Sequence, residues 1–155
     1  MLAALVVTGT AAARSDGPND GTLTVKNGDG RIVIIGRGAV IGRFDKGQVT
    51  IRDPNPNDGI GPIVTGADAT QSLNEKTTRY SGSNVRFRMI GGSFSITVFG
   101  TDINLSAIGK GMVTLNGTLG GRGNVDDGTY AVNGGAPQSF PNFFYTFPLD
   151  AQSGG

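Results

Sequence analysis

Hydrophobic and polar residues alternate with a period of two over much of the chain, which is the pattern of half-buried β-strands. Residues 22–26 alternate strictly, and the apolar run 31–35 follows the turn sequence Asn27-Gly28-Asp29-Gly30. The two runs are therefore predicted to form a β-hairpin. Glycines interrupt the next apolar run, residues 39–44, and a Lys-Gly turn precedes residues 48–52. This part of the chain is predicted to hold four strands.

The four-stranded pattern recurs later in the chain. Residues 86–116 align with residues 22–52 without a gap, so that Lys110-Gly111 falls on Lys46-Gly47 and Gly100 falls on Gly36. The alternative to a duplication is a chance resemblance, because strand patterning alone makes unrelated strands look alike. The alignment favours an internal repeat of one four-stranded unit.

Two such units predict an all-β fold of eight strands. A four-stranded sheet with one apolar face cannot stand alone in water, so the two antiparallel units must bury their apolar faces against each other. The expected result is a β-sandwich or an eight-stranded β-barrel. The side chains expected to point inward are Leu23, Val25, Ile32, Ile34, Ile41, Val49 and Ile51 in the first unit, and Phe87, Met89, Ile96, Val98, Leu105, Val113 and Leu115 in the second.

The amino-acid composition excludes several kinds of catalytic and metal site. The 155 residues include 27 Gly and no Cys or His. Thiol nucleophiles, disulfides, a Ser-His-Asp triad and ordinary zinc, copper or haem sites are therefore excluded. The 13 basic and 12 acidic side chains leave a net charge of +1, which favours neither nucleic acid nor an anionic membrane as a partner. The length fits a single domain, predicted at residues 22–139.

The first residues differ from the rest. An apolar run at residues 2–7 is followed by small residues up to Ala13, the pattern of a secretory signal peptide at residues 1–13. Residues 14–21 read as a linker. The run is too short for a membrane-spanning helix, and the alternative is an ordinary first strand. We expect a secreted or otherwise extracytoplasmic protein with no integral membrane span.

A candidate cation site follows the first unit. Asp53, Asn55, Asn57 and Asp58 place oxygen side chains in the loop that begins at residue 53, with a spacing that resembles a calcium loop. The match is partial, because Val64 stands where a bidentate Glu would be needed. Turns stabilised by Asp and Asn side chains are the favoured interpretation, and calcium is the one cofactor considered.

Aromatic residues crowd the C-terminal segment. Phe140, Phe143, Phe144, Tyr145 and Phe147 fall within eight residues of the chain. Because exposed aromatic clusters promote aggregation, we expect residues 140–155 to form a tail that packs over an open end of the sheet. The functional alternative is a ligand-binding or partner-binding surface made by these five side chains.

The sequence supports a catalytic site or an anion-binding site less strongly than the features above. A carboxylate-based hydrolase would require two of Asp58, Asp102, Asp126 and Asp127 to meet in a cleft. Solvated turn carboxylates are the simpler interpretation. Four cations, Lys76, Arg79, Arg86 and Arg88, could form an anion-binding strip, and the commoner explanation is the charged outer face of a strand.

The Asn-Asp-Gly turns, the Lys-Gly-x-Val-Thr strands and the closing Asp127-Gly128-Thr129-Tyr130 segment resemble short exported all-β proteins of actinobacteria. The resemblance implies export and no catalytic residue. The leading hypothesis is therefore a non-catalytic secreted or envelope-associated interaction or structural module, whose partner is an envelope component or another protein. A β-barrel or β-sandwich that binds a small ligand or glycan is the alternative. The oligomeric state of the protein is left open under both hypotheses.

Overall fold

Two very long strands form most of the protein. The computed structural model describes residues 19–117 and 127–152, so the predicted signal peptide and part of the linker lie outside the described residues. Strand β1 spans Gly21–Arg52, strand β4 spans Thr77–Gly117, and the two pair in an antiparallel manner. The shorter strands are β2 (Ile63–Thr65), β3 (Ala69–Asn74), β5 (Thr129–Val132), β6 (Gln138–Ser139) and β7 (Tyr145–Leu149).

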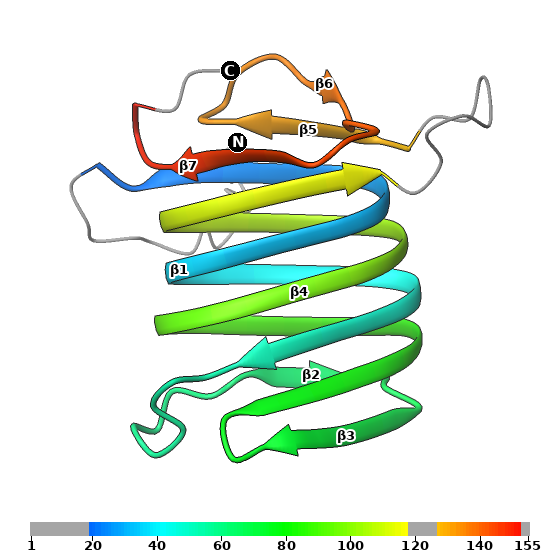
Figure 1. Cartoon of the computed structure of the whole chain (residues 1–155), viewed down its shortest axis with the longest axis vertical. Helices are drawn as coiled ribbons and strands as arrows, with labels where there is room; N and C mark the ends of the chain where they lie inside the picture. The colour runs from blue at the N-terminus through cyan, green and yellow to red at the C-terminus, as the bar shows by residue number, and fades with distance from the viewer. Residues whose placement is uncertain (1–18, 118–126, 153–155) are drawn as a thin grey trace, which may run out of the picture.

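β1 and β4 wind around a common axis as a two-stranded coil (Figure 1). Ile32 lies opposite Val98 on one side and opposite Leu115 on the other, so β4 passes the same point of β1 twice, 17 residues apart. Because the pairing continues along the length of β1, each turn of the coil is hydrogen-bonded to the next. The coil therefore behaves as one continuous antiparallel sheet wound around its own core.

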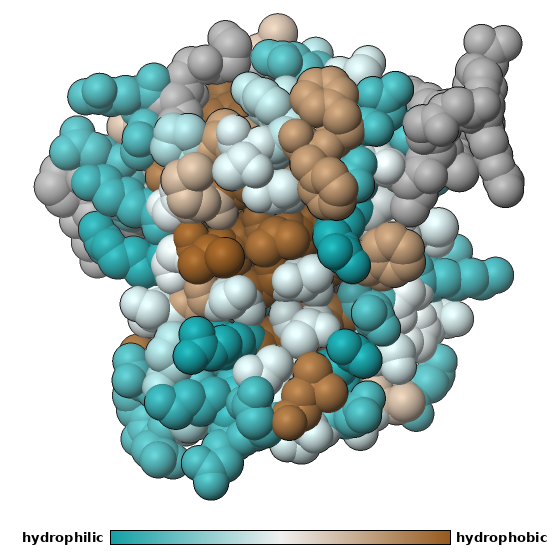
Figure 2. Space-filling view, viewed as in Figure 1, coloured by the Kyte–Doolittle hydropathy of each residue, from teal (hydrophilic) through white to brown (hydrophobic). Residues whose placement is uncertain are grey.

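The coil is flattened into two faces, and half-turns of β1 and β4 alternate across each face. One face is bordered by β5, which pairs with the start of β1, and by β2, which pairs with β4 at Arg86–Arg88. The other face is bordered by β7 and β3, which pair with two other parts of β4. We call them the β2–β5 face and the β3–β7 face; Figure 2 shows the latter.

Glycines mark the edges at which the coil bends from one face to the other. Gly38 faces Gly109 and Gly47 faces Gly100 on neighbouring turns. At each of these four positions a Cβ atom would overlap a carbonyl group of the adjacent turn. Glycine therefore permits a bend that the close approach of two backbones would otherwise prevent.

The core lies inside the coil, and period-two alternation places it there. Thirteen of the fourteen side chains expected to point inward are buried, and the exception is Ile41, which is 44% exposed. Ile32, Ile34, Val40 and Phe44 are all buried, so the alternation keeps its phase through the bend at Gly38, and Ala39 is an additional buried residue at that bend. As a result Gly42, and not Ile41, takes the inward position next to Leu105.

The structure confirms the all-β, antiparallel fold, and its two faces agree with the sandwich arrangement. The sheet does not close into a barrel. The expected hairpin at residues 27–30 is wrong, because β1 continues through that segment and pairs with β4 on both sides of it. Asn27 has a φ of 52°, which bends the strand locally without reversing it. The sequence duplication stays a prediction.

The two ends of the coil are covered by the remaining segments. The segment between β1 and β4 contributes β2 and β3 at one end. At the other end β7 pairs with β4 from Gly111 to Leu115, while Phe140, Phe147 and Leu149 are buried against the core. No helix among the described residues is long and apolar enough to cross a membrane.

Candidate functional site

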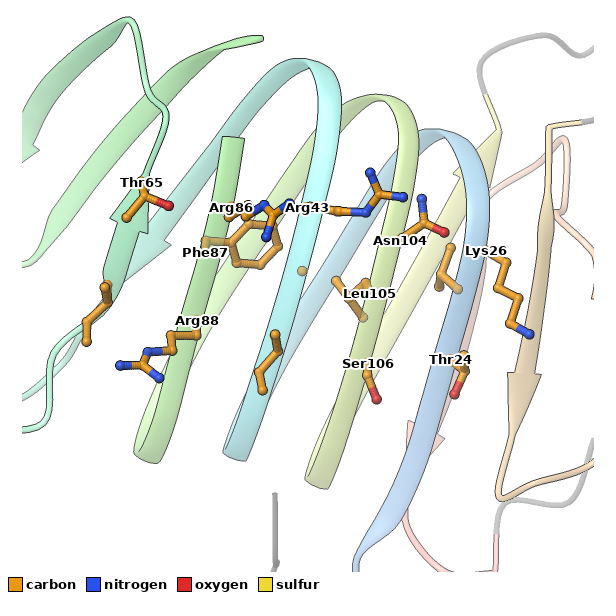
Figure 3. Close-up of a pocket in the computed structure, with 14 residues that line it drawn as sticks. Thr24, Lys26, Arg43, Thr65, Arg86, Phe87, Arg88, Asn104, Leu105 and Ser106 are labelled. Carbon is orange, nitrogen blue, oxygen red and sulfur yellow. The ribbon is translucent and has the colours of Figure 1, made fainter. Parts of the chain in front are cut away.

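The most distinctive feature of the surface is a groove of about 640 Å³ across the β2–β5 face (Figure 3). Five neighbouring segments build it, in the order β2, β4, β1, β4 and β1. A volume of this size falls within the range of small-molecule sites, about 300–1,000 Å³. The coil thus brings together residues that lie up to 82 positions apart in the chain, from Thr24 to Ser106.

The floor of the groove is apolar. Gly42 lies at its centre, and the ring of Phe87 packs so closely beneath it that a Cβ atom on Gly42 would overlap the ring. Phe87 is buried and lies 6.4 Å from Phe44 between ring centroids. Leu105 and Val25 continue the floor on the neighbouring turns. The absent side chain of Gly42 therefore leaves room for the Phe87 ring directly beneath the backbone of the groove floor.

A row of cations runs along one side of the groove. Arg43 is the direct cross-strand partner of Arg86, and on its other side it faces Asn104. Lys26 follows on the next strand, and Figure 3 shows these four side chains along the same border. Because neighbouring strands are about 4.8 Å apart, the two arginine side chains start from adjacent positions on the sheet. We call Lys26, Arg43, Arg86 and Asn104 the cationic row.

A second row of side chains in the groove is more apolar than the cationic row. Ile41 faces Arg88 on one side and Ser106 on the other, and Ile63 of β2 faces Arg88 from the far side. Ile41 is 44% exposed and Ile63 is 50% exposed. Arg88 therefore lies between two isoleucines, where its methylene stem can cover apolar surface while its charge stays in water. We call Ile41, Ile63 and Arg88 the isoleucine row.

No carboxylate balances these charges within the described residues. Among the described residues the groove is lined by four cations and no Asp or Glu, and no hydrogen bond or ion pair holds the side chains of Lys26, Arg43, Arg86 or Arg88. The imbalance belongs to the whole coil. β1 and β4 carry ten of the 13 Lys and Arg residues but only three of the 12 Asp and Glu residues. The near-neutral net charge is thus the sum of a basic coil and acidic connecting segments.

The β3–β7 face also carries exposed apolar side chains, which gather near its centre in Figure 2. Ile35, Phe99 and Met112 are 42–55% exposed. Arg31 lies over the ring of Phe99 at 5.8 Å from the ring centroid, so this cation already has a partner. A smaller hollow on this face is lined by Arg37 and Arg52. The face provides matched positions for control variants.

The predicted calcium residues lie together in one loop. The Asp53 side chain accepts a hydrogen bond from the Asn55 amide at 2.9 Å, and the Asp58 side chain accepts one from the Ile60 amide at 2.8 Å. These are Asx turns, the favoured interpretation of the motif. Asn57 belongs to the same loop, and the part of the chain that the structure describes contains no group of three Asp, Glu, His or Cys residues able to hold a metal. Calcium binding stays a prediction.

The aromatic tail divides into buried and exposed members. Phe140 and Phe147 are buried, whereas Phe143 and Phe144 are 60% and 69% exposed. The ring of Tyr145 lies tilted against that of Phe147, with 5.3 Å between the ring centroids. The cluster therefore stabilises the β7 end of the coil and presents two rings to solvent.

Tyr130 joins this cluster and gives a testable pH dependence. Burial and the nearby Tyr145 raise the pKa of Tyr130, whose hydroxyl donates to Gln138 Oε1 at 3.1 Å. Because the folded state holds the proton more tightly than the unfolded state, this contribution is present below the unfolded pKa of about 10 and is lost as the pH rises beyond it. We expect the melting temperature of the native protein, measured by circular dichroism, to fall above pH 10. The melting temperature of the Tyr130→Phe variant is expected to fall less steeply. An identical alkaline slope in both proteins would contradict this role.

The other predicted site residues are dispersed. Asp102 lies at a bend of β4, where its amide donates to the Asp29 side chain at 2.8 Å, and Asp127 is buried near Gly117. Asp58 lies in the loop after β1, and Asp126 lies outside the described residues. The expected strip of four cations does not form, because Arg79 pairs with Thr50 on the opposite face from Arg86 and Arg88. Lys76 lies in the turn between β3 and β4.

Sequence reasoning missed Arg43, Lys26 and the two isoleucines of the groove. The available signal for Lys26 and Arg43 was their outward phase, whereas Ile41 was expected to point inward. The identity of the neighbours of each residue depends on the register of the coil. Comparison of the chain with protein-family models, with curated proteins and with solved structures finds no match. The geometry of the groove is thus the basis on which a function can be argued.

Proposed function

We propose that the protein is a non-catalytic binding module that holds an anionic ligand in the groove of the β2–β5 face. The observation that supports this most is the direct pairing of Arg43 with Arg86, without a carboxylate partner among the described residues. Like charges at directly opposed positions of a sheet destabilise it. A bound anion would turn this repulsion into two attractive interactions.

The chemistry of the row suits a carboxylate, sulfate or phosphate group. Guanidinium groups present fixed pairs of donors that match these anions in a bidentate manner. Asn104 adds an amide next to Arg43, and Lys26 adds a further positive charge. Thr24, Thr65 and Ser106 border the groove with their hydroxyl groups, and the part of the groove lining that the structure describes has no histidine or carboxylate to act as a base. Binding is therefore favoured over catalysis.

Nucleic acid is a less suitable ligand for this groove. Proteins that hold single strands combine cations with exposed aromatic rings on which bases stack. Among the described residues Phe87 is the one aromatic residue that lines the groove, and it is buried beneath Gly42. We propose instead an anionic small molecule or glycan, and the expected export of the protein would place such a ligand outside the cytoplasm, for instance on a cell envelope.

The proposal is tested by titrating inorganic phosphate and acetate into the protein and following amide chemical shifts by NMR. We expect shifts at Gly42, Arg43 and Arg86, because the anion would lie over them. The double variant Arg43→Gln/Arg86→Gln is expected to weaken binding at least about tenfold, since a hydrogen bond to a charged group contributes about 1.5–3 kcal/mol.

The matched control is Arg37→Gln/Arg52→Gln, which removes the same charge from the β3–β7 face and is expected to keep the affinity. The groove variant should also remain folded and gain about 0.2–1 kcal/mol of unfolding free energy, because the repulsion is removed. Equal weakening in both double variants, or no localised shifts in the native protein, would refute the proposed site.

A further inference from the structure

We infer that the ligand is an anionic amphiphile, a single alkyl chain that ends in a carboxylate or sulfate group. This inference rests on the proposed function and specifies its ligand class. The cationic row would hold the charged group of this ligand. The isoleucine row and the apolar floor would hold its alkyl chain.

The two rows lie side by side at a spacing that suits such a molecule. Ile41 and Arg43 point outward from the same strand on either side of Gly42, and residues two apart along a strand are about 6.6 Å apart. Across the strands, Ile63 and Ile41 both neighbour Arg88, which places them two strand spacings apart, about 10 Å. An alkyl chain laid across the strands would therefore contact both isoleucines while its head group reaches Arg43 and Arg86.

The exposure of these isoleucines supports an apolar ligand segment. Single exposed hydrophobic residues are common on proteins, but here two of them border one groove whose floor is also apolar. A purely polar anion would leave Ile41 and Ile63 in water. A neutral lipid would leave the four cations without a partner. An amphiphilic anion satisfies both rows, and charge complementarity sets its orientation.

The inference is tested by isothermal titration calorimetry with hexanoate, octanoate and dodecanoate, each below its micelle concentration, and with neutral dodecyl maltoside. A fully buried methylene strengthens binding about fourfold, and a half-buried one about twofold. We expect affinity to rise about twofold per added methylene, which gives about 60-fold from hexanoate to dodecanoate. The maltoside is expected to bind at least about tenfold more weakly than dodecanoate.

Two variants distinguish the contribution of the ligand's alkyl chain to affinity from that of its head group. Ile41→Thr/Ile63→Thr keeps β-branched residues in both strands and is expected to reduce the gain per methylene while leaving the affinity for acetate unchanged. The control Ile35→Thr removes an exposed isoleucine from the β3–β7 face and is expected to change neither value.

The outcomes distinguish the two proposals. Affinity that is independent of chain length, or that is higher for an anionic polysaccharide such as polygalacturonate, would overturn the amphiphile and leave the anion site standing. Equal binding of dodecanoate and dodecyl maltoside would also overturn it, because the charge would not contribute. If no anion binds, including phosphate and acetate, the proposed function itself fails.

Discussion

Gly38→Ala is expected to lower the unfolding free energy by about 3–5 kcal/mol, enough to unfold a domain of ordinary stability under mild conditions. Gly38 has a φ of 132°, a conformation that residues with a Cβ atom adopt only under strain. A Cβ atom there would also overlap the carbonyl oxygen of Ile108 on the adjacent turn. The backbone strain and the overlap add to each other.

The overlap cannot be relieved locally, because both backbones bend at the same edge. Gly109, the partner of Gly38, would in turn drive a Cβ atom into the carbonyl oxygen of Arg37. Moving one backbone away would break hydrogen bonds on both sides of the turn, since β1 is paired with β4 on each side. The cost therefore spreads along the coil.

Urea unfolding followed by circular dichroism measures this effect. Gly61→Ala is the control, because a Cβ atom at Gly61 would meet nothing within 4 Å. We expect the control to stay within about 0.5 kcal/mol of the native protein, as surface substitutions usually do. A loss below about 1 kcal/mol for Gly38→Ala would show that the bend does not depend on glycine.

The period-two pattern was sufficient to predict an all-β antiparallel fold and nearly all of its core. Strand alternation depends only on local geometry, so it reports which side chains share a face. It fails at Ile41, because the expected core changes phase between Ile34 and Ile41, whereas the strand keeps its phase through the bend at Gly38 and buries Val40 and Phe44.

The continuity of β1 could not be inferred in the same way. Asn27 to Gly30 favours a reversal by its local turn chemistry, but pairing with a distant part of the chain decides the path: Gly30 lies opposite both Gly100 and Gly117. In retrospect the spacing of Gly30, Gly38 and Gly47 carries the signal. Successive glycines lie about half of the 17-residue turn apart, as edges between two faces require.

The groove was beyond sequence reasoning for a related reason. Arg43 and Arg86 become partners only because the register of β1 against β4 changes by one residue between the Arg37–Ser93 pair and the Ala39–Ile90 pair. Gly91 and Gly92, both with positive φ, lie in β4 at this point and accommodate the extra residue. A basic strand face was foreseeable, whereas the identity of its cross-strand pairs was not.

Phe87→Ala is expected to cost about 3–5 kcal/mol, the usual loss when a buried aromatic side chain is truncated. Gly42→Ala alone is expected to cost about 1–3 kcal/mol, because the added methyl group overlaps the Phe87 ring and overpacks the core. Combined, the two changes should cost less than their sum, since the methyl group enters the space that the ring has left. A coupling of about 1–3 kcal/mol in a double-mutant cycle is the expected result.

The cycle also tests whether the groove floor and the core are one packed unit. Leu115→Ala provides the control, because Leu115 is fully buried in the last half-turn of β4 on the β3–β7 face, where it pairs with Ile32 and Tyr145. The loss of unfolding free energy caused by Leu115→Ala should add to that caused by Gly42→Ala within about 0.5 kcal/mol. Additivity in the Gly42–Phe87 cycle as well would mean that the ring does not support the floor.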